Sequence, residues 1–189
     1  MNIRILPALI VATGATLLFS DAQAAISVLG SGPAQICYQA AENGASPADY
    51  MTYCNQALAG TLSDADRAAT FVNRGVLRLA MNDNDAAAED FRAGLAINTN
   101  LGEGYVDLGA TMIAKKHYAD AIRNIDRGLS LGTKKPHLAY YDRAMADEAI
   151  GNLQAAYDDY RHALALKPDF TPASDELTRF KIVDKPSGT

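Results

Sequence analysis

Apolar positions along most of the chain recur with the three-to-four-residue spacing of amphipathic helices. Downstream of about residue 63, this pattern predicts six helices in three consecutive pairs. Turn and capping residues separate them, including Ser63 and Asp85 before helices and Gly151 between two. Because the connections are short, we expect antiparallel neighbours. The predicted pairs are 64–81 with 85–98, 102–115 with 118–131, and 136–150 with 152–166.

Small residues occupy matched places in the successive pairs. They recur at an interval of 34 and then 35 residues, once in the first helix of each pair and once in the second. A period near 34 is typical of a helix-turn-helix solenoid, in which each pair buries its apolar face against the next. The matched residues are Gly75, Gly109 and Ala144, and then Ala87, Ala121 and Ala156.

The first 24 residues have the pattern of an export signal. Arg4 gives a positive start, Ile5 to Phe19 form an apolar run, and Ala22-Gln23-Ala24 is a small-x-small cleavage site. The apolar run is shorter than the ~20 residues needed to span a bilayer, which disfavours the alternative of a membrane anchor. We therefore predict a signal peptide over 1–24, a mature chain that begins at Ala25, and no stable membrane insertion.

Both cysteines lie in the predicted mature chain, where an oxidising compartment favours their pairing. Two short helices, 34–42 and 47–59, place Cys37 and Cys54 on neighbouring elements. We expect one disulfide that staples an N-terminal helical cap over residues 25–66. Redox catalysis is disfavoured, because the cysteines lack the Cys-x-x-Cys spacing and no histidine precedes residue 117.

At the other end, a helix over 171–182 is expected to cover the exposed face of the last pair. We expect the tail over 184–189 to be disordered.

The three pairs resemble tetratricopeptide repeats, as units 68–101, 102–135 and 137–170. The family's proline near the end of each unit is present once, as Pro168, with Thr99 and Thr133 in its place elsewhere. The resemblance implies an all-α, right-handed superhelical solenoid over 67–183. Besides the small residues above, it rests on these family positions: Phe71, Tyr105 and Tyr140; Phe91, Ile125 and Tyr160; Gly94, Gly128 and Ala163.

The resemblance also implies a function, which is to hold a peptide or partner surface in a concave groove lined by the first helices. The matching positions are mainly apolar and lack the Lys, Asn and Arg side chains that clamp a C-terminal carboxylate in chaperone-binding members. We expect an apolar helix or an extended segment, with a basic residue that meets Asp107 and Asp142. The alternative is that these side chains pack between repeats or face water. They are Val72, Asn73, Val76, Leu79, Val106, Asp107, Ala110, Ile113, Tyr141, Asp142, Met145 and Glu148.

A comparison of the three copies predicts two ion pairs. Arg74 and Arg143 stand at one position of the first helix, and Asp90 and Asp159 follow sixteen residues later. In the middle copy both residues change together, to Leu108 and Asn124. We expect Arg74–Asp90 and Arg143–Asp159 to be partly buried structural salt bridges, with an apolar contact in the middle repeat.

The net charge of −5 is unchanged by loss of the leader, which carries only Arg4 and Asp21. The mature chain thus lacks the basic stripe of a nucleic-acid-binding protein. The three histidines show no repeated relation to a nucleophile or carboxylate, and Asn82 to Asp85 lack the central Gly and closing Glu of a calcium loop. We therefore predict no catalytic site, cofactor or metal. The expected role is a periplasmic, or secreted, adaptor for a protein partner; the alternative is a self-associating envelope module that forms a homo-oligomer.

Overall fold

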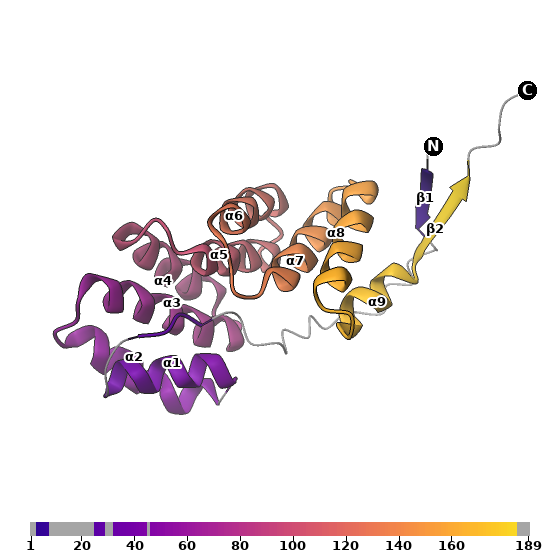
Figure 1. Ribbon diagram of the computed structural model, residues 1–189. Coiled ribbons are helices and arrows are strands. Elements are labelled where there is room, and N and C mark those ends of the chain that lie inside the picture. The colour runs from indigo at the N-terminus through magenta and orange to yellow at the C-terminus, as the bar shows by residue number, and fades with distance from the viewer. Residues whose placement is uncertain (1–2, 8–24, 29–31, 45, 185–189) are drawn as a thin grey trace, which may run out of the picture.

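The computed structural model describes residues 3–7, 25–28, 32–44 and 46–184, with backbone alone for 3–7 and 181–184. Its helices stack in antiparallel pairs along one curved row (Figure 1). The all-α architecture predicted from the sequence is confirmed. The helices are α1 (Pro33–Asn43), α2 (Pro47–Ala59), α3 (Asp64–Ala80), α4 (Asn84–Ile97), α5 (Gly102–Ala114), α6 (Tyr118–Leu131), α7 (Pro136–Ala149), α8 (Leu153–Leu166) and α9 (Thr171–Leu177).

The helix ends follow local sequence chemistry. The Ser63 side chain accepts a hydrogen bond from the backbone N–H of Asp66 at 3.1 Å and so caps α3. Within each repeat the turn between the two helices places one residue in the left-handed region. These residues are Asn82, Lys116 and Gly151, and each occupies the same place in its repeat. The repeat in the sequence is therefore matched by a repeat in the backbone conformation of the turns.

The helix expected over 171–182 is shorter than predicted. It ends at Leu177, and residues Phe180–Asp184 form strand β2, which pairs antiparallel with β1 (Ile3–Pro7). Phe180, Ile182 and Val183 are aromatic or β-branched residues that favour a strand over a helix. Residues 185–189 of the predicted tail and 8–24 of the predicted leader lie outside the described residues.

The core runs through the helix pairs. A main cluster extends from the Cys37–Cys54 disulfide to Ala146 in α7, and a smaller one joins α7, α8 and α9 around Tyr160. The predicted disulfide is thus present, and both cysteines are fully buried. Small residues allow close helix contact: a Cβ atom on Gly109 would lie 2.5 Å from Ile125 Cγ1.

Candidate protein-binding face

The twelve predicted groove residues come from α3, α5 and α7, and we call this surface the first-helix face. Its first third is covered by the chain's own segment Ala25–Val28. Asn73 Oδ1 accepts a hydrogen bond from the backbone N–H of Ile26 at 2.7 Å. Asn73 Nδ2 donates to the Ile26 carbonyl at 2.8 Å. One side-chain amide therefore satisfies both backbone groups of one residue, as a neighbouring strand would.

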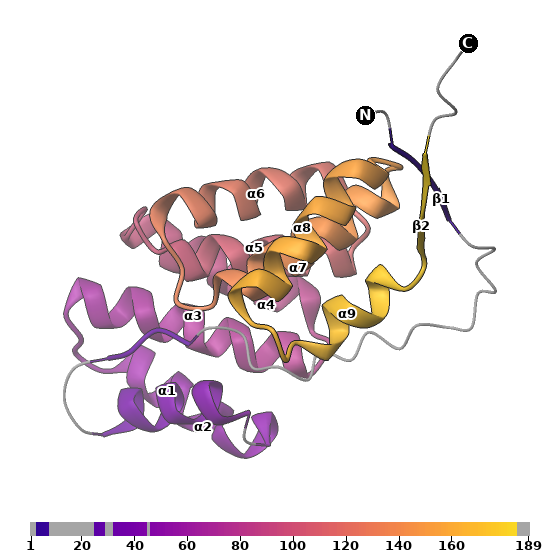
Figure 2. The same ribbon diagram turned by 45° about the vertical axis from the view of Figure 1, so that its right-hand side comes forward.

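Apolar contacts hold the same segment. Ala25 is fully buried in the main core cluster, and Val28 packs in a small cluster with Ala34 of α1, Ala57 of α2 and Ala69 of α3. Figures 1 and 2 show the segment alongside α3, with its Val28 end leading to α1. The first repeat thus holds extended backbone between the disulfide-linked hairpin and α3.

Two carboxyl groups occupy the place of Asn73 in the next repeats. Asp107 is 1% exposed, and neither of its oxygens has a hydrogen-bond partner in the described part of the chain. Burial raises the pKa of Asp107 well above its usual range, and the negative charges of Asp142 and Glu103 raise it further, against the opposing effect of Lys135. Burial also raises the pKa of Asp142 to about 7.

Most of the other predicted groove residues are buried. Those from α3 and α5 are each at most 6% exposed, and they pack in the main core cluster wherever they are apolar. The residues of this face that keep accessible surface in the third repeat are Tyr141, Met145 and Glu148, which are half-buried. The Glu148 carboxylate accepts a hydrogen bond from the Tyr160 hydroxyl at 3.0 Å and pairs with Arg179 at 2.9 Å. Tyr141 and Met145 are therefore the residues best placed to meet a partner.

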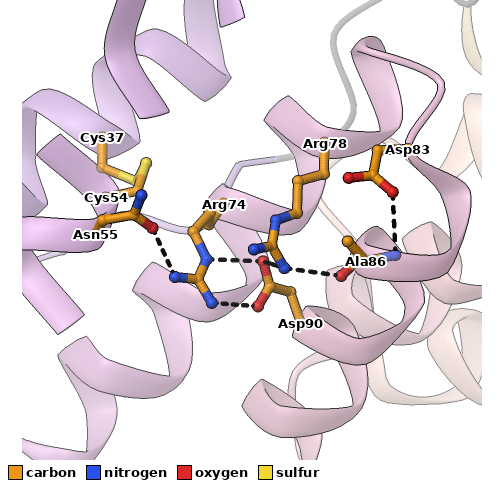
Figure 3. A network of polar contacts seen from close by, with 8 residues as sticks. All are labelled: Cys37, Cys54, Asn55, Arg74, Arg78, Asp83, Ala86 and Asp90. Atoms are coloured by element: carbon orange, nitrogen blue, oxygen red, sulfur yellow. Dashed lines mark hydrogen bonds and ion pairs between the residues drawn. A yellow bond between two sulfur atoms is a disulfide. The ribbon is translucent and has the colours of Figure 1, made fainter. Parts of the chain in front are cut away.

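The Arg74 network joins three helices (Figure 3). Arg74 Nε and Nη2 donate to the two carboxylate oxygens of Asp90 in α4 at 2.9 and 2.7 Å, and Nη1 donates to Asn55 Oδ1 in α2 at 2.8 Å. Arg78 also pairs with Asp90 at 2.9 Å and donates to the Ala86 carbonyl at 3.1 Å. Because the Asp90 side chain is only 3% exposed, it is a buried anion with two cationic partners.

The third repeat contains the equivalent network. Arg143 donates to both oxygens of Asp159 in α8 at 2.7 and 2.9 Å, and to Asp126 in α6 at 2.5 Å. In the middle repeat, Leu108 is buried, and Asn124 donates instead to the Asp120 carbonyl of its own helix at 2.8 Å. Both predicted arginine pairs are therefore formed. Each arginine also donates to a side chain of the preceding helix, Arg74 to Asn55 and Arg143 to Asp126. The sixteen-residue spacing does not indicate these additional bonds.

Two of the three histidines pack against aromatic rings. His162 stacks on Tyr140 with ring centroids 4.2 Å apart, and His137 packs edge-on against Phe170. Within the described ranges, no group of three or more metal-ligating side chains comes together. No described helix is both long and apolar enough to cross a membrane.

Residues 137–170 match the tetratricopeptide repeat family. The two preceding helix pairs have the same helix-turn-helix architecture as the matched repeat. No curated protein matches it.

Three solved structures of different proteins have this fold. A chain of the APC/C hetero-tetramer Cut9-Hcn1 aligns with a TM-score of 0.69 and 19% identity, over 78% of this chain and 29% of that one. MamA aligns at 0.62 and 18%, over 79% and 82%. The first such domain of Spaghetti (RPAP3), bound to an HSP90 peptide, aligns at 0.58 and 22%, over 63% and 94%. At these identities the likeness establishes the fold.

Proposed function

We propose that this chain is a non-enzymatic adaptor that binds an extended segment of a partner protein on its first-helix face. The single observation that carries the proposal is the Asn73–Ile26 pair, in which this face holds extended backbone through both polar groups of one residue. Binding of extended peptides by backbone pairing and side-chain pockets is a common recognition mode. It also fits a family whose solved members include a domain with a bound peptide.

Because Ala25–Val28 covers the first repeat, the partner segment is expected over the later repeats. Tyr141 and Met145 supply half-buried apolar contacts there, and Asp142, which is 8% exposed and has a pKa raised to about 7, supplies an acidic group that a basic side chain would hold in its ionised form. A partner with apolar residues and one basic residue complements this surface. A C-terminal carboxylate does not, since Asp142 would repel it.

We also propose that the adaptor works outside the cytoplasm, in the periplasm of a bacterium with two membranes. Two features support this. The first 24 residues have the order of a signal peptide, and the buried Cys37–Cys54 disulfide suits an oxidising compartment.

Photo-crosslinking in periplasmic extract tests the proposal. A benzoylphenylalanine at Tyr141 preserves an aromatic ring and reports the first-helix face, while the same group at Tyr53, an exposed tyrosine of α2, is the matched control. We expect a discrete crosslinked protein from position 141 that is absent from position 53. Equal crosslinking at both positions, or none at position 141, would contradict binding on this face.

The alternative, self-association, predicts that the captured protein is a second copy of the chain. Sedimentation across a hundredfold range of concentration separates the two proposals. A constant monomer mass supports the adaptor.

A further inference from the structure

The proposed partner segment does not account for the burial of Asp107. Both of its oxygens are buried, and neither accepts a hydrogen bond from the described residues, which is costly for a carboxylate. The sequence places it one repeat after Asn73, at the same position of its helix. Asn73 meets the backbone of the Ala25–Val28 segment, so Asp107 stands at the next place along the same face.

The two ends of the segment Ala25–Val28 lie in different surroundings. Val28 packs with Ala34, Ala57 and Ala69 at the N-terminal end of the solenoid. Ala25, on the other side of Ile26, is fully buried in the main core cluster, which also contains Val106 and Ala110 of α5. The Ala25 end therefore lies in the core cluster that joins α3 to α5, the helix that carries Asp107.

We propose that Asp107 binds the α-ammonium group of Ala25 in the processed chain. The proposal rests on removal of the leader after Ala24, and it is independent of whether a partner binds the face. Cleavage there creates a cation at the end of a segment whose next residue is already fixed by Asn73. A buried cation and a buried carboxylate would each be costly alone, and pairing them removes both costs.

Pairing requires the Ala25 nitrogen to come within hydrogen-bond distance of Asp107. Neighbouring packed helices such as α3 and α5 lie roughly 8–10 Å apart, and one extended residue covers about 3.5 Å of that distance. Pairing therefore requires a shift of the buried Ala25 end as well as extension of the Asp107 side chain toward it. Ile26 keeps its register on Asn73 throughout, because the two hydrogen bonds do not involve Ala25.

Other charged groups around Asp107 favour a cation at this place. Glu103 on the same helix and Asp142 on α7 add negative charge, and Lys135 beside α7 adds one positive charge. The net field at Asp107 therefore attracts an ammonium group. Because Ala25 is fully buried, a cation beside it has to be small. An ammonium group at a chain end meets this requirement better than a long basic side chain.

A four-protein cycle tests the proposal. The full chain is exported with its leader, and mass spectrometry establishes the first residue. Thermal unfolding at pH 7 is then compared for the parent chain, for Asp107→Asn, for a chain with one glycine inserted before Ala25, and for both changes together. The matched control is Asp120→Asn, at an aspartate of α6 that is half-buried and pairs with Arg123 on the same helix.

We expect each single change to lower the melting temperature by roughly 5 °C and the combination to lower it little further, because both remove the same pair. Additive effects, or a glycine insertion without effect, would overturn the proposal. So would a purified chain that does not begin at Ala25.

A second measurement does not depend on stability. Acylation of the α-amine by a limiting amine-reactive reagent is followed by mass spectrometry. We expect the amine to react at least about tenfold faster in Asp107→Asn than in the parent chain, because a paired ammonium is held protonated. Equal rates would overturn the proposal, whereas failure of the photo-crosslinking experiment would leave these expected results unchanged.

Discussion

The outer two repeats and the middle repeat join their helices by different means. In the first and third repeats, Arg74 and Arg143 each bind two oxygens of an aspartate in the second helix and reach a side chain of the preceding helix. In the middle repeat, Leu108 is buried where those arginines stand, and close contact at Gly109 and Gly128 brings α5 against α6. One architecture therefore tolerates a charged or an apolar junction, provided that the small residues keep their places.

The largest expected effect concerns the buried anion of the first repeat. Asp90→Ala leaves two guanidinium groups, Arg74 and Arg78, without their carboxylate. We expect a loss of about 4 kcal/mol in the free energy of unfolding, measured by urea denaturation. Asn124→Ala, at the equivalent place of the middle repeat, is the control and is expected to lose less than about 1 kcal/mol. Equal losses would contradict the distinction between the two kinds of junction.

A somewhat smaller effect is expected from a methyl group at the middle junction. A Cβ atom on Gly128 would lie 2.6 Å from Val106 Cγ2 and 2.7 Å from the Gly102 carbonyl oxygen, which is backbone and cannot move aside freely. We expect Gly128→Ala to cost about 3 kcal/mol by the same measurement.

The third repeat supplies the control for that substitution. Ala163 stands at the equivalent position and is fully buried, so the third repeat accommodates the methyl group that the middle repeat excludes. Ala163→Gly is expected to cost about 1 kcal/mol, through helix propensity and lost packing. Unchanged stability of Gly128→Ala would show that α5 and α6 are able to separate.

A smaller effect tests whether one junction can be converted into the other. Asp159→Asn alone removes the negative charge that pairs with Arg143. We expect it to lower the free energy of unfolding by about 2 kcal/mol. Adding Arg143→Leu recreates the Leu–Asn combination of the middle repeat and removes the stranded cation. We expect the double variant to recover about half of the loss. A double variant less stable than the single one would show that the arginine contributes mainly through Asp126 or its packing on Tyr140.

The last expected effect depends on pH and concerns the first-helix face. Because burial raises the pKa of Asp142 to about 7 in the folded chain, the folded state holds this proton more tightly than the unfolded state. The chain therefore loses stability as the pH rises from about 4 to 7. Asp142→Asn removes that loss, and we expect it to raise the free energy of unfolding by up to about 4 kcal/mol more at pH 8 than at pH 4. A gain that is equal at both pH values would contradict this origin.

The repeated part of the fold was predictable because its signals are periodic. Helix bounds agree with the sequence pattern within a residue or two for the three pairs, and the register of the copies brings Arg74 to Asp90 and Arg143 to Asp159. The disulfide followed from two cysteines on adjacent short helices. In each case several residues support the same local structure.

The features that escaped prediction rest on single, non-repeated contacts. Four residues, Ala25–Val28, carry no helical or strand periodicity, so their pairing with Asn73 left no pattern in the sequence. The sequence pattern predicts that Asn73 contacts a partner, whereas its side chain is bonded to the backbone of the chain's own Ile26. The end of α9 was missed because residues 178–182 continue an apolar spacing compatible with either a helix or a strand.

The Asn73–Ile26 pair has a consequence for the order in which the chain folds. The two residues are 47 positions apart, and the whole disulfide-linked hairpin lies between them. A chain that emerges from a narrow channel with its N-terminus first presents Ile26 well before α3 exists to receive it. The hairpin can form its bond in that interval, but the extended segment must wait for Asn73. Closure of this long-range contact is therefore a late step of folding, which follows formation of the hairpin.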